Sequence, residues 1–222
     1  MRKIYVYLCL ACITILISAE VLGNETDFKL PTLVKQGKDI HSFIPPGWKL
    51  IKNTQGDLNK DGLADIAGIL ESKAPPKDLA EAPPRILFIA FRENQQYRLS
   101  FQTEKAILTA DMGGVWGDPL ESISVDHGSL LINFYGGSNE RWFQSYRFRY
   151  QGNGWYLIGA TLGSYFTPTG AGQTEDYNLL TGMMIITTTD KNGNEQAKNI
   201  HRGKKPLVNL QDFDIALAEN QL

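Results

Sequence analysis

Residues 141–160 read RWFQSYRFRYQGNGWYLIGA, and this stretch carries the strongest structural signal in the chain. Between Tyr146 and Tyr150, aromatic side chains alternate with arginines, which is the period of two expected of a β-strand with one buried face. The Gly-Asn-Gly triplet at 152–154 favours a tight turn, because glycine and asparagine tolerate positive φ angles. An apolar run follows at 155–160. The stretch therefore predicts a β-hairpin.

Similar pairs of strand-like segments lie on both sides of this hairpin: 85–92 with 97–102, 120–126 with 129–135, and 176–180 with 183–189. Turn signals that recur roughly every 8–12 residues are typical of antiparallel sandwiches, barrels and propellers. We therefore expect an all-β fold of antiparallel strands, sandwich or propeller-like, with little helix beyond a short one at 210–218.

Oxygen-bearing side chains recur at alternate positions in GDLNKDGLAD, residues 56–65. A hard cation such as calcium prefers six to eight oxygen ligands at about 2.3–2.6 Å, and a tight loop can supply several of them. Gly62 permits a sharp bend, so that Leu63 can offer its backbone carbonyl. The alternative is a metal-free hairpin turn, since Asp, Asn and Gly favour turns in any case. The spacing predicts calcium ligands at Asp57, Asn59, Asp61, Leu63 and Asp65.

An EF-hand is excluded, because its twelfth loop position is a bidentate Glu and here that position is Gly68. The pattern D-x-N-x-D-G-x-x-D between two strands instead resembles the calcium loops of FG-GAP (integrin-α-type) repeats. The resemblance implies that Asp57, Asn59, Asp61 and Asp65 bind calcium through their side chains and Leu63 through its carbonyl. That family repeats the loop, whereas it occurs once here, which favours one propeller-like blade within a larger β-structure. The similar run at 190–194 reads as a plain turn.

Two glycine-rich loops, MGGVWGDP at 112–119 and YGGSNERW at 135–142, offer aromatic and charged side chains. Glycine lets a ligand approach the backbone closely, while aromatic faces and an arginine can bind sugars, peptides or carboxylates. The alternative is that the glycines form turns or bulges and the aromatics pack inward. The loops resemble Gly-Asp-Pro and Tyr-Gly-Gly-Ser motifs of uncharacterised exported bacterial proteins, a resemblance that implies no activity. The candidate ligand-binding residues are Trp116, Asp118, Tyr135, Arg141 and Trp142.

The N-terminus has the pattern of a bacterial signal peptide at residues 1–23, followed by a single β-rich domain at 24–222. Two basic residues precede an apolar run at 4–18, and small residues follow at Ala19 and Gly23. The run is shorter than the roughly 20 residues that span a bilayer, so we expect no membrane span in the mature form. Lipidation at Cys12 is the less favoured alternative, because Cys12 lies inside the apolar run. We expect a periplasmic or secreted protein.

Charge and motif content exclude several functions. Removing residues 1–23 takes away two positive charges and one negative charge, so the net charge changes from −2 to −3. A nucleic-acid partner is therefore not expected, because it would require a basic face. The mature chain has no cysteine nucleophile, and the sequence has no Gly-x-Ser-x-Gly elbow and no His-Glu-x-x-His zinc motif.

These observations favour a calcium-binding module, or an inhibitor-type protein, that binds a glycan, a cell-wall fragment or a protein, and an enzyme is not favoured. The first alternative is a hydrolase of an envelope polymer, using carboxylates among Asp111, Asp118, Glu121 and Glu140. It requires a carboxyl with a raised pKa and a second one about 5–10 Å away. The binding hypothesis requires exposed Trp116, Tyr135 or Trp142. A purely structural role is the second alternative.

Overall fold

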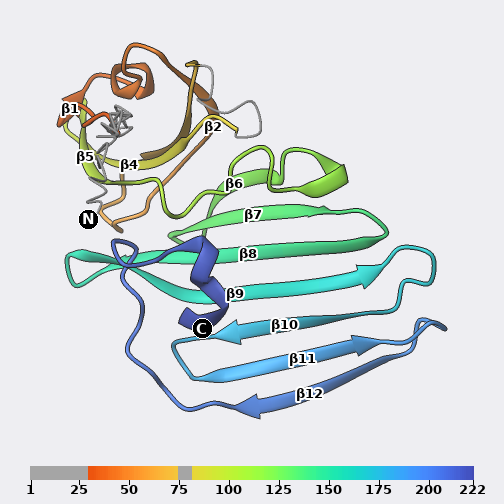
Figure 1. The fold of residues 1–222 in the computed structure, drawn as a ribbon. Coiled ribbons are helices and arrows are strands. Elements are labelled where there is room, and N and C mark those ends of the chain that lie inside the picture. The colour runs from red at the N-terminus through yellow and green to blue at the C-terminus, as the bar shows by residue number, and fades with distance from the viewer. Residues whose placement is uncertain (1–29, 75–81) are drawn as a thin grey trace, which may run out of the picture. The chain divides into compact units, whose positions relative to one another are not determined.

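A computed structural model describes residues 30–74 and 82–222, of which Thr32–Leu222 form one compact unit. Strands in this part of the chain form two sheets in which every pairing is antiparallel (Figure 1). The five-stranded sheet has the order β1 (Gln36–Gly37), β5 (Gln96–Thr103), β4 (Arg85–Glu93), β3 (Asp65–Ser72), β2 (Trp48–Gly56). The seven-stranded sheet has the order β12 (Glu195–His201), β11 (Met183–Thr189), β10 (Gly172–Asn178), β9 (Gly154–Phe166), β8 (Glu140–Gln151), β7 (Ser129–Gly137), β6 (Leu120–Asp126).

Helix is confined to four short segments of the described residues: η1 (Ile40–Phe43), η2 (Gly114–Trp116), η3 (Ile215–Leu217) and α1 (Ala218–Gln221). The predicted all-β antiparallel fold is confirmed, and it is sandwich-like. The short helix expected at 210–218 begins only at Ile215 and ends at Gln221. None of the helices in the described ranges is long and apolar enough to cross a membrane. The predicted signal peptide and Cys12 lie outside the described residues.

The hairpin predicted at 141–160 is formed by β8 and β9. Gln151 pairs with Gly154, so Gly152 and Asn153 alone make the turn, with φ angles of 54° and 62°. Two positive φ angles are those of a type I′ turn, whose twist matches that of the flanking strands. Along β8, Tyr146 and Phe148 are buried, and the intervening arginines are partly exposed. The period-two alternation is therefore confirmed.

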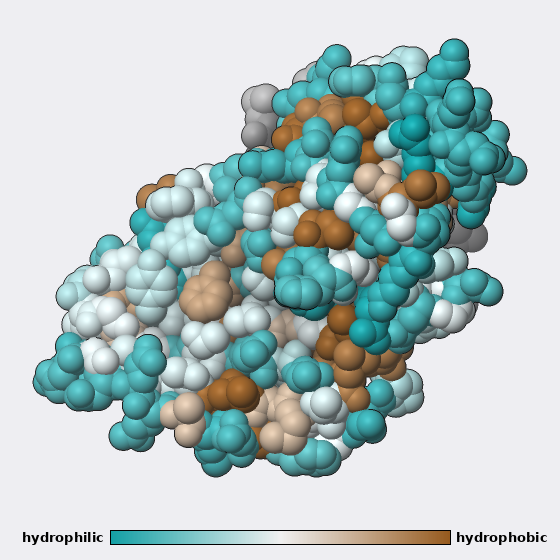
Figure 2. Space-filling model, turned by 180° about the vertical axis from the view of Figure 1, so that it is seen from behind, coloured by the Kyte–Doolittle hydropathy of each residue, from teal (hydrophilic) through white to brown (hydrophobic). Residues whose placement is uncertain are grey.

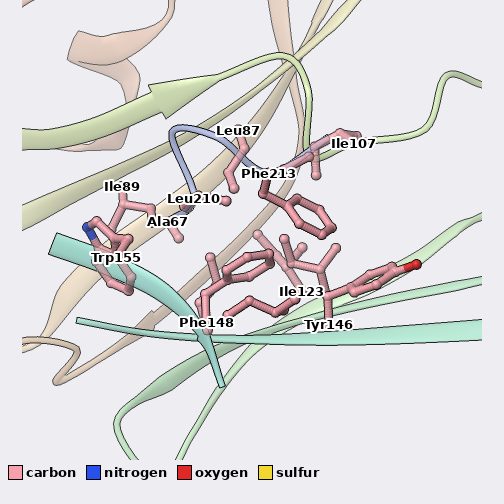
Figure 3. Packing of buried hydrophobic residues seen from close by; sticks show 14 of the residues in the cluster. Ala67, Leu87, Ile89, Ile107, Ile123, Tyr146, Phe148, Trp155, Leu210 and Phe213 are labelled. Carbon is pink, nitrogen blue, oxygen red and sulfur yellow. The ribbon is translucent and has the colours of Figure 1, made fainter. Parts of the chain in front are cut away.

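The hydrophobic core lies between the two sheets and includes the C-terminal segment. In Figure 3, Phe213 lies beside Phe148 and Tyr146, and its ring centroid is 5.1 Å and 5.2 Å from theirs. The five-stranded sheet contributes Ala67, Ile69, Leu87, Ile89 and Phe91 to the same cluster. One core shared by two sheets explains why the fold is a sandwich.

The five-stranded sheet is buried on both faces at its centre. Every residue of β3 is buried, as are residues 85–91 of β4. On the face away from the core, Phe43 of η1 stacks on Phe88 with ring centroids 5.4 Å apart. Burial on both faces accounts for the continuous apolar run at 86–91, which alternation alone would not predict.

Hydrophobic residues also reach the surface. Figure 2 shows them as small brown patches surrounded by hydrophilic residues. The large hydrophobic residues that are most exposed are Val115 at 85%, Leu217 at 53% and Trp116 at 51%. Two of these three lie in η2, within the glycine-rich loop at 112–119.

Candidate ligand-binding and metal sites

The predicted calcium loop connects β2 to β3, and its Asp and Asn side chains accept hydrogen bonds from backbone N–H groups of the same loop. The Asp57 carboxylate accepts hydrogen bonds from the backbone N–H groups of Lys60 at 2.7 Å, Asp61 at 3.2 Å and Gly62 at 3.0 Å. Asn59 accepts from the N–H of Asp61 at 3.0 Å. Positive φ angles of 67° at Lys60 and 85° at Gly62 produce the tight curvature. Gly62 therefore provides the sharp bend that the spacing predicts.

Asp65 anchors the loop to the five-stranded sheet. Its carboxylate is fully buried and accepts backbone N–H groups from Leu58 at 2.8 Å, Asn59 at 3.2 Å and Arg92 at 2.8 Å. Burial raises the pKa of this carboxyl above its usual value of 3.8, while the three backbone hydrogen bonds act in the opposite direction. Leu58 is also fully buried and belongs to the core cluster. Asp65 and Leu58 therefore hold the loop at the edge of the core.

The loop fits calcium in its donor chemistry but only partly in its arrangement. Asp57, Asp61, the Asn59 amide and the Leu63 carbonyl are hard oxygen donors, and an oxygen that accepts one N–H keeps a second lone pair. However, no three His, Cys, Asp or Glu side chains in residues 30–74 and 82–222 are grouped to hold a metal ion. Asp65 is directed at backbone N–H groups. The calcium ligands therefore stay a prediction.

The turn at 190–194 is closed by the side chain of its first residue. Asp190 accepts from the backbone N–H of Asn192 at 2.8 Å and of Asn194 at 2.9 Å. It also accepts from the Asn194 side-chain amide at 2.9 Å, and these hydrogen bonds lower the pKa of the Asp190 carboxyl. This geometry agrees with the predicted plain turn.

Three of the five predicted ligand-binding residues come together in space. Trp116 and Tyr135 form an edge-to-face pair with centroids 4.9 Å apart. The Arg141 guanidinium lies over the Trp116 ring at 4.7 Å and over the Tyr135 ring at 5.9 Å. Tyr165 of β9 joins them, because its hydroxyl is 2.7 Å from that of Tyr135. We refer to Trp116, Tyr135, Arg141 and Tyr165 as the aromatic–arginine cluster.

The glycine-rich loop is placed beside the cluster by backbone pairing with β7. The N–H of Gly137 donates to Gly113 O at 2.9 Å, and the N–H of Tyr135 donates to Pro119 O at 2.9 Å. A Cβ at Gly113 would come 1.9 Å from the Gly117 carbonyl oxygen, so only glycine fits this close approach. The loop therefore extends the sheet past the start of β6 and brings Trp116 over Tyr135.

The cluster is accessible, and its arginine retains donors for a ligand. Trp116 is half exposed, and Met112 and Val115 beside it in the loop are 48% and 85% exposed. Arg141 donates to Gly137 O at 2.9 Å. Among the described residues, it forms no ion pair. The hydrogen bond with Tyr165 raises the pKa of the Tyr135 hydroxyl.

The other two predicted ligand-binding residues lie elsewhere. Trp142 pairs with Gly136, and a Cβ at Gly136 would come 2.4 Å from the Trp142 ring. Trp142 therefore faces the same side of the sheet as buried Phe134, opposite to Tyr135, and it packs against the core. Asp118 instead pairs with Arg85 through two hydrogen bonds, at 2.8 Å and 2.5 Å.

Arg85 and Glu71, which sequence reasoning missed, complete this ionic network. Arg85 is 2% exposed and donates to Glu71 at 2.7 Å and 2.9 Å and to the Leu108 carbonyl at 3.0 Å. Lys49 pairs with Glu71 at 2.8 Å. Burial alone would raise the pKa of both carboxyls, but Lys49 and Arg85 outweigh it at Glu71, and Arg85 outweighs it at Asp118, so both are lowered. The only sign of this network in the sequence is the position of Arg85, a charged residue at the start of an otherwise apolar strand.

The carboxylates proposed for the hydrolase alternative lack the required environment. The pKa of Asp111 is lowered by the hydrogen bond from the Thr109 hydroxyl, and that of Asp118 is lowered as described above. Glu121 and Glu140 are exposed. A general acid needs a raised pKa, so Asp111 and Asp118 are unsuited to that role.

Known proteins provide no further guide: no family model and no curated protein matches this sequence.

Proposed function

We propose that this protein is an exported, calcium-binding β-protein, periplasmic or secreted, that binds another protein through the aromatic–arginine cluster. The observation that carries the proposal is the meeting of Trp116, Tyr135 and Arg141 from a loop and two strands on an accessible surface. Trp, Tyr and Arg are the residues most enriched at the energetic centres of protein interfaces.

The surroundings of the cluster favour a protein over a glycan or a cell-wall fragment. Met112 and Val115 extend the exposed surface beside Trp116 with purely apolar side chains. Such side chains gain free energy when an apolar partner surface covers them, whereas they make no hydrogen bonds with sugar hydroxyls. A partner that buries them would also desolvate Arg141, which strengthens its attraction for a carboxylate.

The partner is therefore expected to present an apolar patch next to an aspartate or glutamate. Arg141 is pre-positioned for that carboxylate, because its guanidinium lies over the Trp116 ring, close to the Tyr135 ring, and donates to the Gly137 carbonyl. A side chain that is already ordered loses less conformational entropy on binding. Calcium, bound by Asp57, Asn59, Asp61, Asp65 and the Leu63 carbonyl, would neutralise the loop carboxylates and stiffen the scaffold away from this surface.

The test compares four forms of the protein as bait for the exported proteins of its host. A partner should be retained equally by wild type and by Arg98→Ala, which removes an exposed arginine of the other sheet. Its affinity should fall at least about ten-fold in Trp116→Ala and in Arg141→Ala. Equal retention by all four forms would contradict the proposal. If no protein partner is found but a glycan array shows binding that depends on the cluster, the ligand of the cluster is a sugar rather than a protein.

A further inference from the structure

A hollow lies on the opposite face of the seven-stranded sheet from the aromatic–arginine cluster. It has a volume of about 410 Å³, and its lining includes Trp142, Gln144, Leu162, Gln173, Glu175 and Glu219. We refer to it as the inner-face groove, because Trp142, Gln144, Leu162, Gln173 and Glu175 share the face that carries the core residue Tyr146. A volume of this size is in the range of small-molecule binding pockets.

Strand register explains where the groove lies. Trp142 of β8 is opposite Ser164 of β9, which is opposite Gln173 of β10, and the next row contains Gln144, Leu162 and Glu175. In the row after that, Tyr146 and Ala160 are already buried in the core. In the two outer rows, Trp142 and Leu162 are only partly buried at the border of the core, and Glu219 of α1 lines the groove beside them. In Figure 1, α1 is the coiled segment at the C-terminus.

The polar side chains of the groove are held by one another. Glu175 accepts from the Gln173 amide at 2.9 Å and from the Tyr177 hydroxyl. Burial and the contact with Glu175 raise the pKa of Tyr177 to about 12, so its hydroxyl stays protonated as a donor. The Gln144 amide oxygen accepts from the Tyr146 hydroxyl at 3.2 Å. The amide N–H groups of Gln144 take no part in this hydrogen bond.

This arrangement offers both donors and acceptors to a ligand. Glu175 keeps further lone pairs, the Gln173 amide oxygen is an acceptor, and the Gln144 amide nitrogen is a donor. Sugar hydroxyls need such a mixture, because each hydroxyl both donates and accepts. Trp142 and Leu162 add the apolar surface on which the C–H face of a sugar ring packs. Trp142 and Gln173 lie two strands apart, or roughly 9.5 Å, which exceeds the width of one sugar ring.

The charges of the groove disfavour an anionic ligand. Glu175 and Glu219 are opposed by Arg202, whose guanidinium lies over the Tyr177 ring at 5.3 Å. The charged residues lining the groove therefore carry one net negative charge. A peptide would need its backbone groups paired along a strand edge, whereas these polar groups stand on a sheet face.

We propose that the inner-face groove binds a neutral oligosaccharide of two or more rings. The site is independent of the aromatic–arginine cluster, which lies on the other face of the same sheet. Trp142 and Leu162 support the rings, while Gln144, Gln173 and Glu175 hydrogen-bond to their hydroxyls.

The test is titration calorimetry of the whole protein with cellohexaose, xylohexaose and chitohexaose as neutral probes and hexagalacturonate as the anionic one. At least one neutral probe should bind and should change the tryptophan fluorescence. Its affinity should fall about five-fold in Gln173→Ala and about ten-fold in Glu175→Gln. The matched control is Gln196→Ala, which removes the same side chain from the same face two strands away.

Affinity should be unchanged in Gln196→Ala and in Trp116→Ala, the variant that impairs the cluster. Failure of all three neutral probes to bind the folded wild-type protein would overturn the proposal. Tighter binding of hexagalacturonate, or an equal loss in Gln196→Ala, would also overturn it. Loss in Trp116→Ala would show that the sugar binds at the cluster instead.

Discussion

At the scale of single residues, environment separates side chains that look alike in sequence. Trp116 and Trp142 both follow glycine pairs, yet one is exposed over Tyr135 and the other packs against the core on the opposite face. Asp57 and Asp118 both lie in glycine-containing loops. The first accepts backbone N–H groups of its own loop, and the second is paired with a buried arginine.

Removing the Arg85 charge should be strongly destabilising. In Arg85→Met, Glu71 would remain buried with Lys49 as its ion-pair partner, and Asp118 would lose its own. The Asp118 side chain is 46% exposed, so hydration of its carboxylate would partly offset the loss of the ion pair. We expect a loss of about 3 kcal/mol in the free energy of unfolding, measured by urea denaturation. Arg98→Ala, in an exposed pair, should change it by less than about 0.5 kcal/mol.

The same network should make stability depend on pH in acid. Glu71 and Asp118 have lower pKa values in the folded protein than their usual 4.5 and 3.8. Their contribution is therefore complete above those values and is lost as pH falls through the lowered ones. Asp65, whose pKa is raised, acts with the opposite sign. Unfolding free energies measured from about pH 6 to pH 3 should fall more steeply in wild type than in Arg85→Met, and parallel curves would contradict this.

At the scale of elements, the local sequence predicted the tight turns correctly but not the course of the glycine-rich loop. The turns after β6 and β8 each place two residues at positive φ, at His127 and Gly128 and at Gly152 and Asn153. Their conformations depend on local sterics, which the residues themselves determine. The 112–119 loop instead takes its course from backbone pairing with β7, a contact that local sequence does not reveal.

The loop between β2 and β3 should respond to calcium as a unit. If the ion binds the folded protein alone, calcium at a hundred times its dissociation constant should stabilise wild type by about 2.7 kcal/mol. Thermal unfolding with calcium and with chelator should show this rise in wild type and not in Asp61→Ala. The matched control Asp190→Ala alters the plain turn and should keep the full rise. A melting temperature independent of calcium in wild type would contradict the metal site.

At the scale of the whole unit, the two sheets are joined by side chains, and the Gly56 backbone closely approaches a side chain of the other sheet. A Cβ at Gly56, at the end of β2, would come 2.7 Å from Val125 of β6, so glycine permits this contact. Nearby, Leu58 inserts into the core, and the Arg85–Asp118 pair ties β4 to the segment before β6. Phe213 closes the core over β8.

Phe213 should therefore be among the most sensitive positions in the unit. It is fully buried between both sheets, and Phe213→Ala should leave a cavity that costs about 3–5 kcal/mol of unfolding free energy. Phe166→Ala, at a ring that is 40% exposed, should cost much less. Urea denaturation of the two variants measures the difference. Similar losses would show that Phe213 does not join the sheets.

The sequence alone indicated the central strand pairs, the tight turns and the all-β class, because alternation and turn sterics act over a few neighbouring residues. It did not reveal β12, and the strand expected at 176–180 is β10, which spans Gly172–Asn178. The sequence also indicated Trp116, Tyr135 and Arg141 as candidates. Only the tertiary structure decided that these three meet, that Trp142 faces the other way and that Asp118 is held by Arg85. Pairing partners, register and burial on a second face are set by segments distant in the chain, such as Phe43 over Phe88 and Phe213 over Tyr146. The pairing of the 112–119 loop with β7 produces the accessible cluster, and the register of β8, β9 and β10 places the inner-face groove.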